Sequence, residues 1–261
     1  MPEGPCKLCG ATDYALSMGG PTICPACDCG GAEAGLRRQL EAARQEIQAL
    51  KSGHVVTVDP SRKTDKPIAL FDLDGSLADY ESALTQDLID IASPDEPPPE
   101  IYNPPPYLKK RIDLIRQVPG WWRTLDLLDA GFGVFEAATD LGFDTRVLTK
   151  GPQSCVNAWT EKLEWCQDYL PDDTQVTITR DKSSVYGRVL VEDYVPFLKG
   201  WLNQRPRGLG ILLENEHNKG FKHPRVFVFD GSMAKEQQLI AVLEAARDRE
   251  DGQPLCLEGI L

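Results

Sequence analysis

Residues 68–76 read Ile-Ala-Leu-Phe-Asp-Leu-Asp-Gly-Ser, an apolar run that ends in two aspartates and a glycine. The four apolar residues predict a short buried strand. Side chains alternate between the faces of a strand, so Asp72 and Asp74 are expected to project to the same side. Neighbouring carboxylates repel each other unless a cation lies between them, and oxygen ligands suit Mg²⁺. The pattern predicts a magnesium site with one carboxylate as nucleophile and the other as general acid; the alternative is a calcium loop or a solvated Asp-Gly turn.

The chain from Pro67 onward alternates strand patterns with helical patterns. Strands are predicted at 67–71, 145–149, 175–179, 188–192 and 225–229, and helices at 79–91, 107–117, 121–141, 153–170 and 232–249. Such alternation predicts an α/β fold, a Rossmann-like parallel sheet with helices on both faces. Ligands then bind at the carboxyl ends of the strands. Seven prolines between Pro94 and Pro106 interrupt the pattern. The insertion around them, about residues 77–143, is expected to form a helical cap over the site.

Three other predicted strands end in residues suited to phosphate chemistry. Thr149 follows Arg-Val-Leu, and its hydroxyl with the next backbone N–H groups could grip phosphate oxygens. Lys182 lies just after the next strand and could neutralise both phosphate and carboxylates, although a solvated charge run has the same appearance. Glu192 and Asp193 end a further apolar strand. Adjacent residues point opposite ways, so one acid is expected to bind the metal directly while the other supports it.

Four motifs follow one another along the chain, each at the end of a predicted strand: Asp-x-Asp-Gly, Thr, Lys and Glu-Asp. This order resembles that of the haloacid dehalogenase superfamily of phosphatases. The resemblance covers residues 67–235. Within the superfamily the chain is most similar to the 5′(3′)-deoxyribonucleotidases, through Thr-Arg-Asp-Lys at 179–182, Glu-Lys-Leu-Glu-Trp at 161–165 and Asn-Glu-His-Asn at 215–218. It departs from that family at Ser76, Glu192 and Lys150. The resemblance implies a phosphoric monoester hydrolase acting on deoxyribo- or ribonucleoside monophosphates through an aspartyl-phosphate.

The resemblance also assigns roles to individual residues. Asp72 is the expected nucleophile and Asp74 the expected acid and base. Mg²⁺ would be held by Asp72, the backbone carbonyl of Asp74, and Asp193. The expected phosphate-binding residues are Thr149, Lys162, Lys182 and Arg180. Trp121 and Trp122 in the cap are candidates for stacking a nucleobase, although adjacent tryptophans are more often divided between core and surface.

The first 30 residues hold five of the eight cysteines. The pairs Cys6-x-x-Cys9 and Cys24-x-x-Cys27 have the spacing of a tetrahedral site made of four cysteine thiolates. Residues 1–30 therefore predict a structural zinc module whose metal supplies the folding energy. A redox or disulfide cluster is the alternative. Cys29 is a spare thiol or a competing fourth ligand.

Residues 31–52 are predicted to be helical, and residues 53–66 to be a polar linker before the catalytic domain at 67–261. Leu36, Leu40, Ala43, Ile47 and Leu50 are spaced as a heptad seam. This predicts either a short helix that forms a homodimer through residues 36–50 or a helix that packs on its own domain. Three heptads are marginal as an independent coiled coil.

Composition limits the partners. The net charge of −12 argues against a surface that coats nucleic acid, although a local basic patch would still be compatible with it. No apolar run approaches a membrane span, and no signal peptide is recognised, so a cytoplasmic protein is expected. Two alternatives to a nucleotidase follow from the cysteine module: a phosphatase delivered to nucleic-acid ends or another phosphorylated target, and a non-enzymatic zinc and coiled-coil interaction protein.

Overall fold

The computed structural model describes residues 66–250, 255, 257 and 260, all of which belong to the unit Thr64–Leu261. The predicted zinc module, the heptad helix and all but the last residue of the predicted linker lie outside the described residues. None of the helices in the described part has the length and apolar character required to span a membrane.

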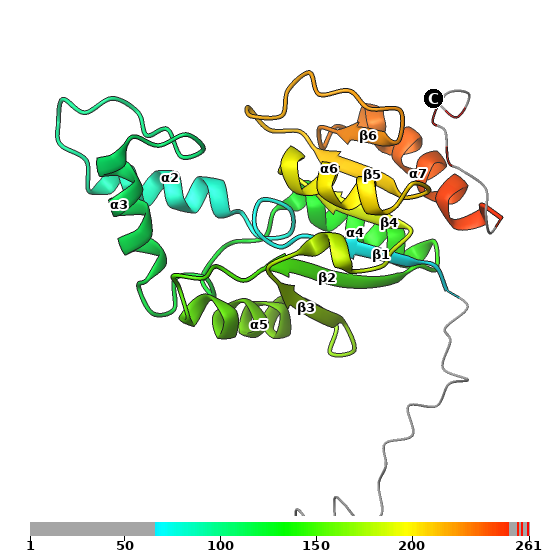
Figure 1. Ribbon diagram of the computed structural model, residues 1–261, viewed down its shortest axis with the longest axis horizontal. Coiled ribbons are helices and arrows are strands. Elements are labelled where there is room, and N and C mark those ends of the chain that lie inside the picture. Colours follow the sequence, from blue (N-terminus) through cyan, green and yellow to red (C-terminus); the bar gives the residue numbers. More distant parts are fainter. Residues whose placement is uncertain (1–65, 251–254, 256, 258–259, 261) are drawn as a thin grey trace, which may run out of the picture. The chain divides into compact units, whose positions relative to one another are not determined.

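The described chain is an α/β fold built on one parallel sheet (Figure 1). Its strands are β1 (Ile68–Phe71), β2 (Asp144–Lys150), β3 (Gln175–Thr179), β4 (Val189–Glu192), β5 (Leu209–Leu213) and β6 (Val226–Phe229). Its helices are α2 (Tyr80–Asp90), α3 (Pro106–Arg116), α4 (Asp129–Asp140), α5 (Asn157–Tyr169), α6 (Val195–Gln204), α7 (Met233–Asp248) and the short 3₁₀ helix η1 (Lys182–Ser184).

The six strands lie in the order β3-β2-β1-β4-β5-β6, and every neighbouring pair is parallel. The chain starts in the middle of the sheet, builds outward to β3, and then returns to the other side of β1. The predicted parallel sheet is therefore confirmed. The point at which the order reverses lies between β1 and β4, and ligands of doubly wound sheets bind beside that point at the carboxyl ends of the strands.

Alternation along β1 divides the core into two layers. Ala69 and Phe71 pack into a large cluster with residues of α4, α5 and α7. Leu70 points the other way, into a smaller cluster with Leu198 and Trp201 of α6. Successive side chains of a strand face opposite sides, so a sheet covered on both faces is buried throughout. Helices on both faces are the arrangement that the sequence predicts.

One strand and one α-helix, as well as the short helix η1, are absent from the predicted list. β5, Leu-Gly-Ile-Leu-Leu, is buried along its whole length. A short continuous apolar run carries no alternation to mark it as a strand. α6 begins with Val-Pro and contains Gly200, which read as turn residues. Proline is tolerated in the first turn of a helix because those N–H groups have no partner within the helix.

The prediction of one helix over 121–141 is wrong in its first third, because α4 begins only at Asp129. The preceding residues pair with the loop after β1. The N–H of Leu128 donates to the carbonyl of Leu77, and the N–H of Asp79 donates to the carbonyl of Asp126, both at 2.8 Å. These bonds take backbone groups that a longer helix would use.

Helices α2 and α3 stand beyond the carboxyl end of the sheet (Figure 1). Both lie within the predicted cap insertion. By contrast, α4, which also falls within residues 77–143, packs on the large core cluster through Val134, Phe135 and Ala138.

Candidate active site

Three acids meet at the switch point of the sheet. Asp72 follows β1 directly, Glu192 is the last residue of β4, and Asp193 comes next. Each offers a carboxylate oxygen, and these oxygens all lie within 4.8 Å of one another. All three side chains are buried. Asp193 lies beyond the end of β4, so the alternation expected for Glu192 and Asp193 does not hold and both acids reach the same place.

Gly75 lets Asp193 approach the loop that follows β1. Its φ of +73° belongs to the left-handed region, which residues with a side chain rarely adopt. A Cβ at this position would lie 2.4 Å from Oδ2 of Asp193. The glycine of the Asp-x-Asp-Gly stretch is thus required both for the turn and for the space that the third carboxylate occupies.

Lys182 neutralises two of these acids. Its Nζ lies 2.6 Å from Oδ1 of Asp72 and 2.8 Å from Oε2 of Glu192, and its side chain is buried. η1 places it there: Asp181 caps this 3₁₀ turn by accepting from the N–H of Ser183. The strand-end position predicted for Lys182 is thus also the position from which it contacts Asp72. A solvated charge run does not describe it.

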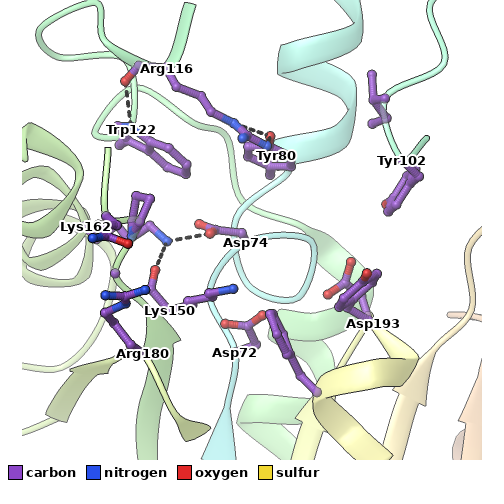
Figure 2. A pocket seen from close by; sticks show the side chains of 16 residues that line it. Asp72, Asp74, Tyr80, Tyr102, Arg116, Trp122, Lys150, Lys162, Arg180 and Asp193 are labelled. Carbon is purple, nitrogen blue, oxygen red and sulfur yellow. Dashed lines mark hydrogen bonds and ion pairs between the residues drawn. The ribbon is translucent and has the colours of Figure 1, made fainter. Parts of the chain in front are cut away.

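Asp74 has a lysine of its own. Nζ of Lys162, on α5, lies 2.5 Å from Oδ2 of Asp74 (Figure 2). The same ammonium donates to Oγ1 of Thr149 at 3.2 Å and to the carbonyl of Lys150 at 2.8 Å. Thr149 is fully buried, and its hydroxyl accepts this hydrogen bond from Lys162 and does not face the cavity. Oδ1 of Asp74 has no hydrogen-bond partner among the described residues.

Burial and mutual repulsion raise the pKa values of these acids. Burial raises the pKa of Asp193 to about 8, and the charge of Asp72 adds to the effect. Burial, with Asp72 again, raises the pKa of Glu192 well above its ordinary range. Burial also raises the pKa of Asp74 against the opposing charge of Lys162. Burial alone would lower the pKa of Lys182, but the charges of Asp72 and Glu192 outweigh it and raise that pKa.

The charge balance leaves room for a divalent cation. Four carboxylates share this site, and the ion pairs within it supply two lysines, Lys162 and Lys182. Oε1 of Glu192 is a second buried carboxylate oxygen with no partner among the described residues. Hard cations prefer such oxygen ligands. The donor set of Asp72, Glu192 and Asp193 therefore fits Mg²⁺.

A cavity of about 460 Å³ opens onto these groups. It has the size of a small-molecule site. The lining residues are Asp72, Asp74, Tyr80, Ile101, Tyr102, Arg116, Trp122, Lys150, Gly151, Pro152, Gln153, Lys162, Arg180, Asp193, Tyr194 and Phe197 (Figure 2). Of the residues predicted from the sequence, the cavity brings together Asp72, Asp74, Asp193, Lys162, Arg180 and Trp122. Thr149, Lys182 and Trp121 are not among the lining residues; the first two lie behind the wall.

The two tryptophans are separated. Nε1 of Trp121 donates to Asp87 of α2 at 2.6 Å. Trp122 faces the cavity with its ring 4.6 Å from Nζ of Lys162 and stacked on the ring of Tyr80 at 5.7 Å. Glu161 fixes this turn: its carboxylate accepts from the backbone N–H groups of Gly120 at 2.8 Å and Trp122 at 3.1 Å. Trp122 is therefore the one candidate for stacking that meets the cavity.

Several lining residues were not predicted. Lys150 follows Thr149, and its Nζ lies 4.6 Å from the ring of Phe197. Its position directly after a strand-end threonine was the available signal. Tyr80, Tyr102 and Arg116 come from the cap, where nothing in the local sequence marks them as site residues.

The Asn-Glu-His-Asn segment supports the site from behind. Asn218 is buried, and its Nδ2 donates to the carbonyl of Asp193 at 2.9 Å and to that of Leu213 at 2.7 Å. His217 contacts the ring of Tyr102, with the centroids 3.2 Å apart. Asn218 thus holds the backbone that carries the third acid, and His217 contacts the cap.

Comparison with known proteins gives only distant likenesses. No protein-family model matches the sequence, and a search of curated proteins finds no match. Among solved structures, a CbbY from Rhodobacter sphaeroides in complex with phosphate is 12% identical in sequence, with a TM-score of 0.35. The matched region covers 62% of this chain and 92% of the CbbY chain. A haloacid dehalogenase-like hydrolase from Burkholderia xenovorans is 12% identical over 69% of this chain and 95% of its own, with a TM-score of 0.39. Likeness at this level identifies no family and no activity.

Proposed function

We propose that this chain is a Mg²⁺-dependent phosphomonoesterase of the haloacid dehalogenase type. The observation that carries the proposal is the convergence of Asp72, Glu192 and Asp193 within 4.8 Å at the switch point of a doubly wound sheet, beside the Lys162-bound Asp74. Phosphoryl transfer needs a nucleophile, a proton donor and compensation of negative charge. The site offers two carboxylates with different surroundings, an excess of negative charge that a divalent cation would balance, and a cavity for the substrate.

Asp72 is the proposed nucleophile. One of its oxygens attacks phosphorus, an oxygen–phosphorus bond forms, and the bond from phosphorus to the leaving alcohol breaks. Lys182 holds Asp72 through Oδ1, which fixes its orientation. Water then attacks phosphorus in the aspartyl-phosphate, inorganic phosphate is released, and the carboxylate returns.

Asp74 is the proposed acid and base. Lys162 binds its Oδ2, and Oδ1 has no partner among the described residues, so the carboxyl group can hold a proton. Because burial raises the pKa of Asp74, its protonated form persists to higher pH and can donate to the leaving alcohol. The resulting carboxylate takes a proton from the attacking water in the second step. Without that donor the leaving group would depart as an alkoxide.

Mg²⁺ would be held by Asp72, Asp193 and the backbone carbonyl of Asp74, with Oε1 of Glu192 as a further oxygen. When bound it would neutralise the acids and the phosphate oxygens. Lys162, Lys150 and Arg180 line the cavity and are the proposed side chains that bind the phosphate. Thr149 and Lys182 act one step removed, through Lys162 and Asp72.

Deoxyribo- or ribonucleoside monophosphates are the proposed substrates. The similarity to the deoxyribonucleotidases at residues 161–165, 179–182 and 215–218 supports this choice, and so does the aromatic wall formed by Trp122, Tyr80 and Phe197. The test is a phosphate-release screen over nucleoside monophosphates and other phosphomonoesters, with Mg²⁺ and with a chelator. Release from no member of the screen in the presence of Mg²⁺ would overturn the proposal; release from other esters alone would overturn the nucleotide substrate.

A further inference from the structure

Arg116 enters the cavity without an acidic partner. Among the described cations that line the cavity, Lys162 is paired with Asp74, whereas Arg116, Lys150 and Arg180 form no ion pair with a described carboxylate. Arg116 is half-buried. A guanidinium that has no carboxylate within ion-pair distance and faces a cavity is available to bind an anion from outside the chain.

The main chain of Arg116 is firmly held. It is the last residue of α3, and its carbonyl accepts from Nε1 of Trp122 and from Sγ of Cys155, both at 2.9 Å. The carbonyl groups at the end of a helix have no partner within it, and these bonds satisfy one of them. The side chain therefore starts from a fixed point at the cavity wall.

Tyr80 orients the guanidinium. Nε of Arg116 donates to the hydroxyl oxygen of Tyr80 at 2.7 Å, Nη2 donates to the same oxygen, and the guanidinium carbon lies 5.2 Å from the ring centroid. Nη1 is not used by Tyr80. Because the hydroxyl oxygen accepts from Arg116, its own O–H is directed elsewhere. Burial raises the pKa of Tyr80 to about 12, so the phenol keeps that proton. The pair offers donors only.

Arg116 and Tyr80 lie away from Asp72, the proposed nucleophile. In Figure 2 they occupy the cap side of the cavity, with Asp74 between them and Asp72. The proposed site of the reacting phosphate is already served by Lys162, Lys150 and Arg180. A fourth cation on the opposite wall, paired with a hydroxyl donor, exceeds what one phosphate requires.

We propose that Arg116 and Tyr80 form a second anion subsite, and that among nucleotides and other phosphomonoesters the enzyme prefers those that carry a carboxylate or a second phosphate besides the phosphate that is hydrolysed. The subsite deepens the proposed function and rests on it. Guanidinium binds both kinds of anion with two N–H groups, so the two sources share one recognition chemistry.

Three substrate pairs test the subsite, each differing by one anionic group. They are uridine and orotidine 5′-monophosphate, glycerol 3-phosphate and 3-phosphoglycerate, and fructose 6-phosphate and fructose 1,6-bisphosphate. The first two pairs add a carboxylate and the third adds a phosphate. In the full-length protein with Mg²⁺, kcat/KM should favour the second member of at least one pair by about tenfold or more. Arg116→Gln should lower kcat/KM about 100-fold on that member and less than about threefold on its partner.

Controls separate recognition from folding. Arg111→Gln, on the same helix but paired with Glu96 at 2.7 Å, should leave both members of the pair unchanged. Arg116→Lys keeps the charge but loses the planar geometry, and should lose an intermediate amount. Tyr80→Phe should reduce the preference without abolishing it.

Two results overturn the subsite. One is a full-length protein that hydrolyses both members of all three pairs equally. The other is an Arg116→Gln variant that loses the same factor on both members of the preferred pair. Failure of the proposed function gives a different result, since no member of any pair would then release phosphate.

Discussion

The two sides of the cavity differ in how densely they are charged and in which elements supply their residues. On the sheet side, Asp72, Glu192 and Asp193 sit at strand ends within 4.8 Å of one another, and Lys182 is bonded to two of them. On the cap side, Arg116 and Tyr80 come from two helices outside the sheet and leave donors free. The sheet side therefore has an excess of negative charge that a bound cation would balance, whereas the cap side has few charged groups. In the proposed function, the sheet side carries out the chemistry and the cap side recognises the substrate.

The sharpest test of the sheet side is Asp72→Asn. Removing the nucleophile should lower kcat by about 10⁴-fold or more, because no other group occupies its position. The free energy of unfolding should change little, since Lys182 keeps Glu192 and one repelling charge is removed. Turnover and chemical denaturation of the same preparations measure both. Retention of more than about a tenth of wild-type turnover would remove Asp72 from its role.

Lys182→Met tests the pairing that distinguishes this wall. It leaves Asp72 and Glu192 buried without their common counter-charge, so the free energy of unfolding should fall by about 3 kcal/mol. The exposed Lys222→Met is the matched control and should be neutral. Adding Glu192→Leu to Lys182→Met should recover part of the loss, because one uncompensated charge is then gone. A double variant no more stable than the single one would contradict this account.

Gly75→Ala tests how tightly the acids are placed. The added Cβ meets Oδ2 of Asp193, so kcat/KM should fall about 100-fold through displacement of that carboxylate. Gly220→Ala is the control: Gly220 also has a positive φ, +77°, but no atom lies within 4 Å of a Cβ there. It carries the same backbone cost without the contact. Equal kinetics in the two variants would show that Asp193 tolerates the shift.

The crowding also predicts a pH dependence in chelator. The pKa of Asp193 is raised to about 8, so the folded state keeps a proton that the unfolded chain loses near pH 4. The free energy of unfolding should therefore fall as pH rises between these values. A melting temperature lower by about 5 °C at pH 8 than at pH 5 is expected. Adding Mg²⁺, or replacing Asp193 in Asp193→Asn, should reduce this dependence of the melting temperature on pH. If neither changes it, groups other than Asp193 cause the dependence.

The smallest effect is expected from removing residues 1–60. Every catalytic residue proposed here follows Pro67, so kcat/KM of the truncated protein should stay within about twofold of the full chain. Elemental analysis of the full chain for one zinc, and its mass in solution, would show what the first residues add. A truncated protein that stays folded but loses turnover would mean that this segment completes the active site.

The residues that the sequence places at the sheet side lie close together for a physical reason. Asp72, Asp74, Lys182 and Asp193 each follow an apolar strand, and the carboxyl ends of parallel strands converge on one edge. Local pattern and topology together are enough to bring such residues close. The same logic missed β5, whose continuous burial leaves no alternation.

The cap side could not be predicted in this way. Arg116 ends an amphipathic helix, where an arginine usually faces solvent, and Tyr80 opens another. Their meeting depends on how α3 returns to the sheet, which is set by contacts far apart in the sequence, such as Glu161 with Gly120 and Trp122. Lys162 lines the cavity, but its bonds to Asp74 and Thr149 were not foreseen.

The contacts of Glu161 have a mechanical consequence. Its carboxylate ties the 120–122 turn, the limb by which the cap returns, to α5 in the body of the sheet domain. The outgoing limb is bonded to this returning limb, because Leu77 accepts from Leu128 and Asp79 donates to Asp126. With both limbs clamped, α2 and α3 have no free pivot at their base. For the proposed enzyme we therefore expect substrate exchange to depend on bending within the cap and on movement of Ile101 and Tyr102, which line the cavity, and not on the swing of a hinged lid.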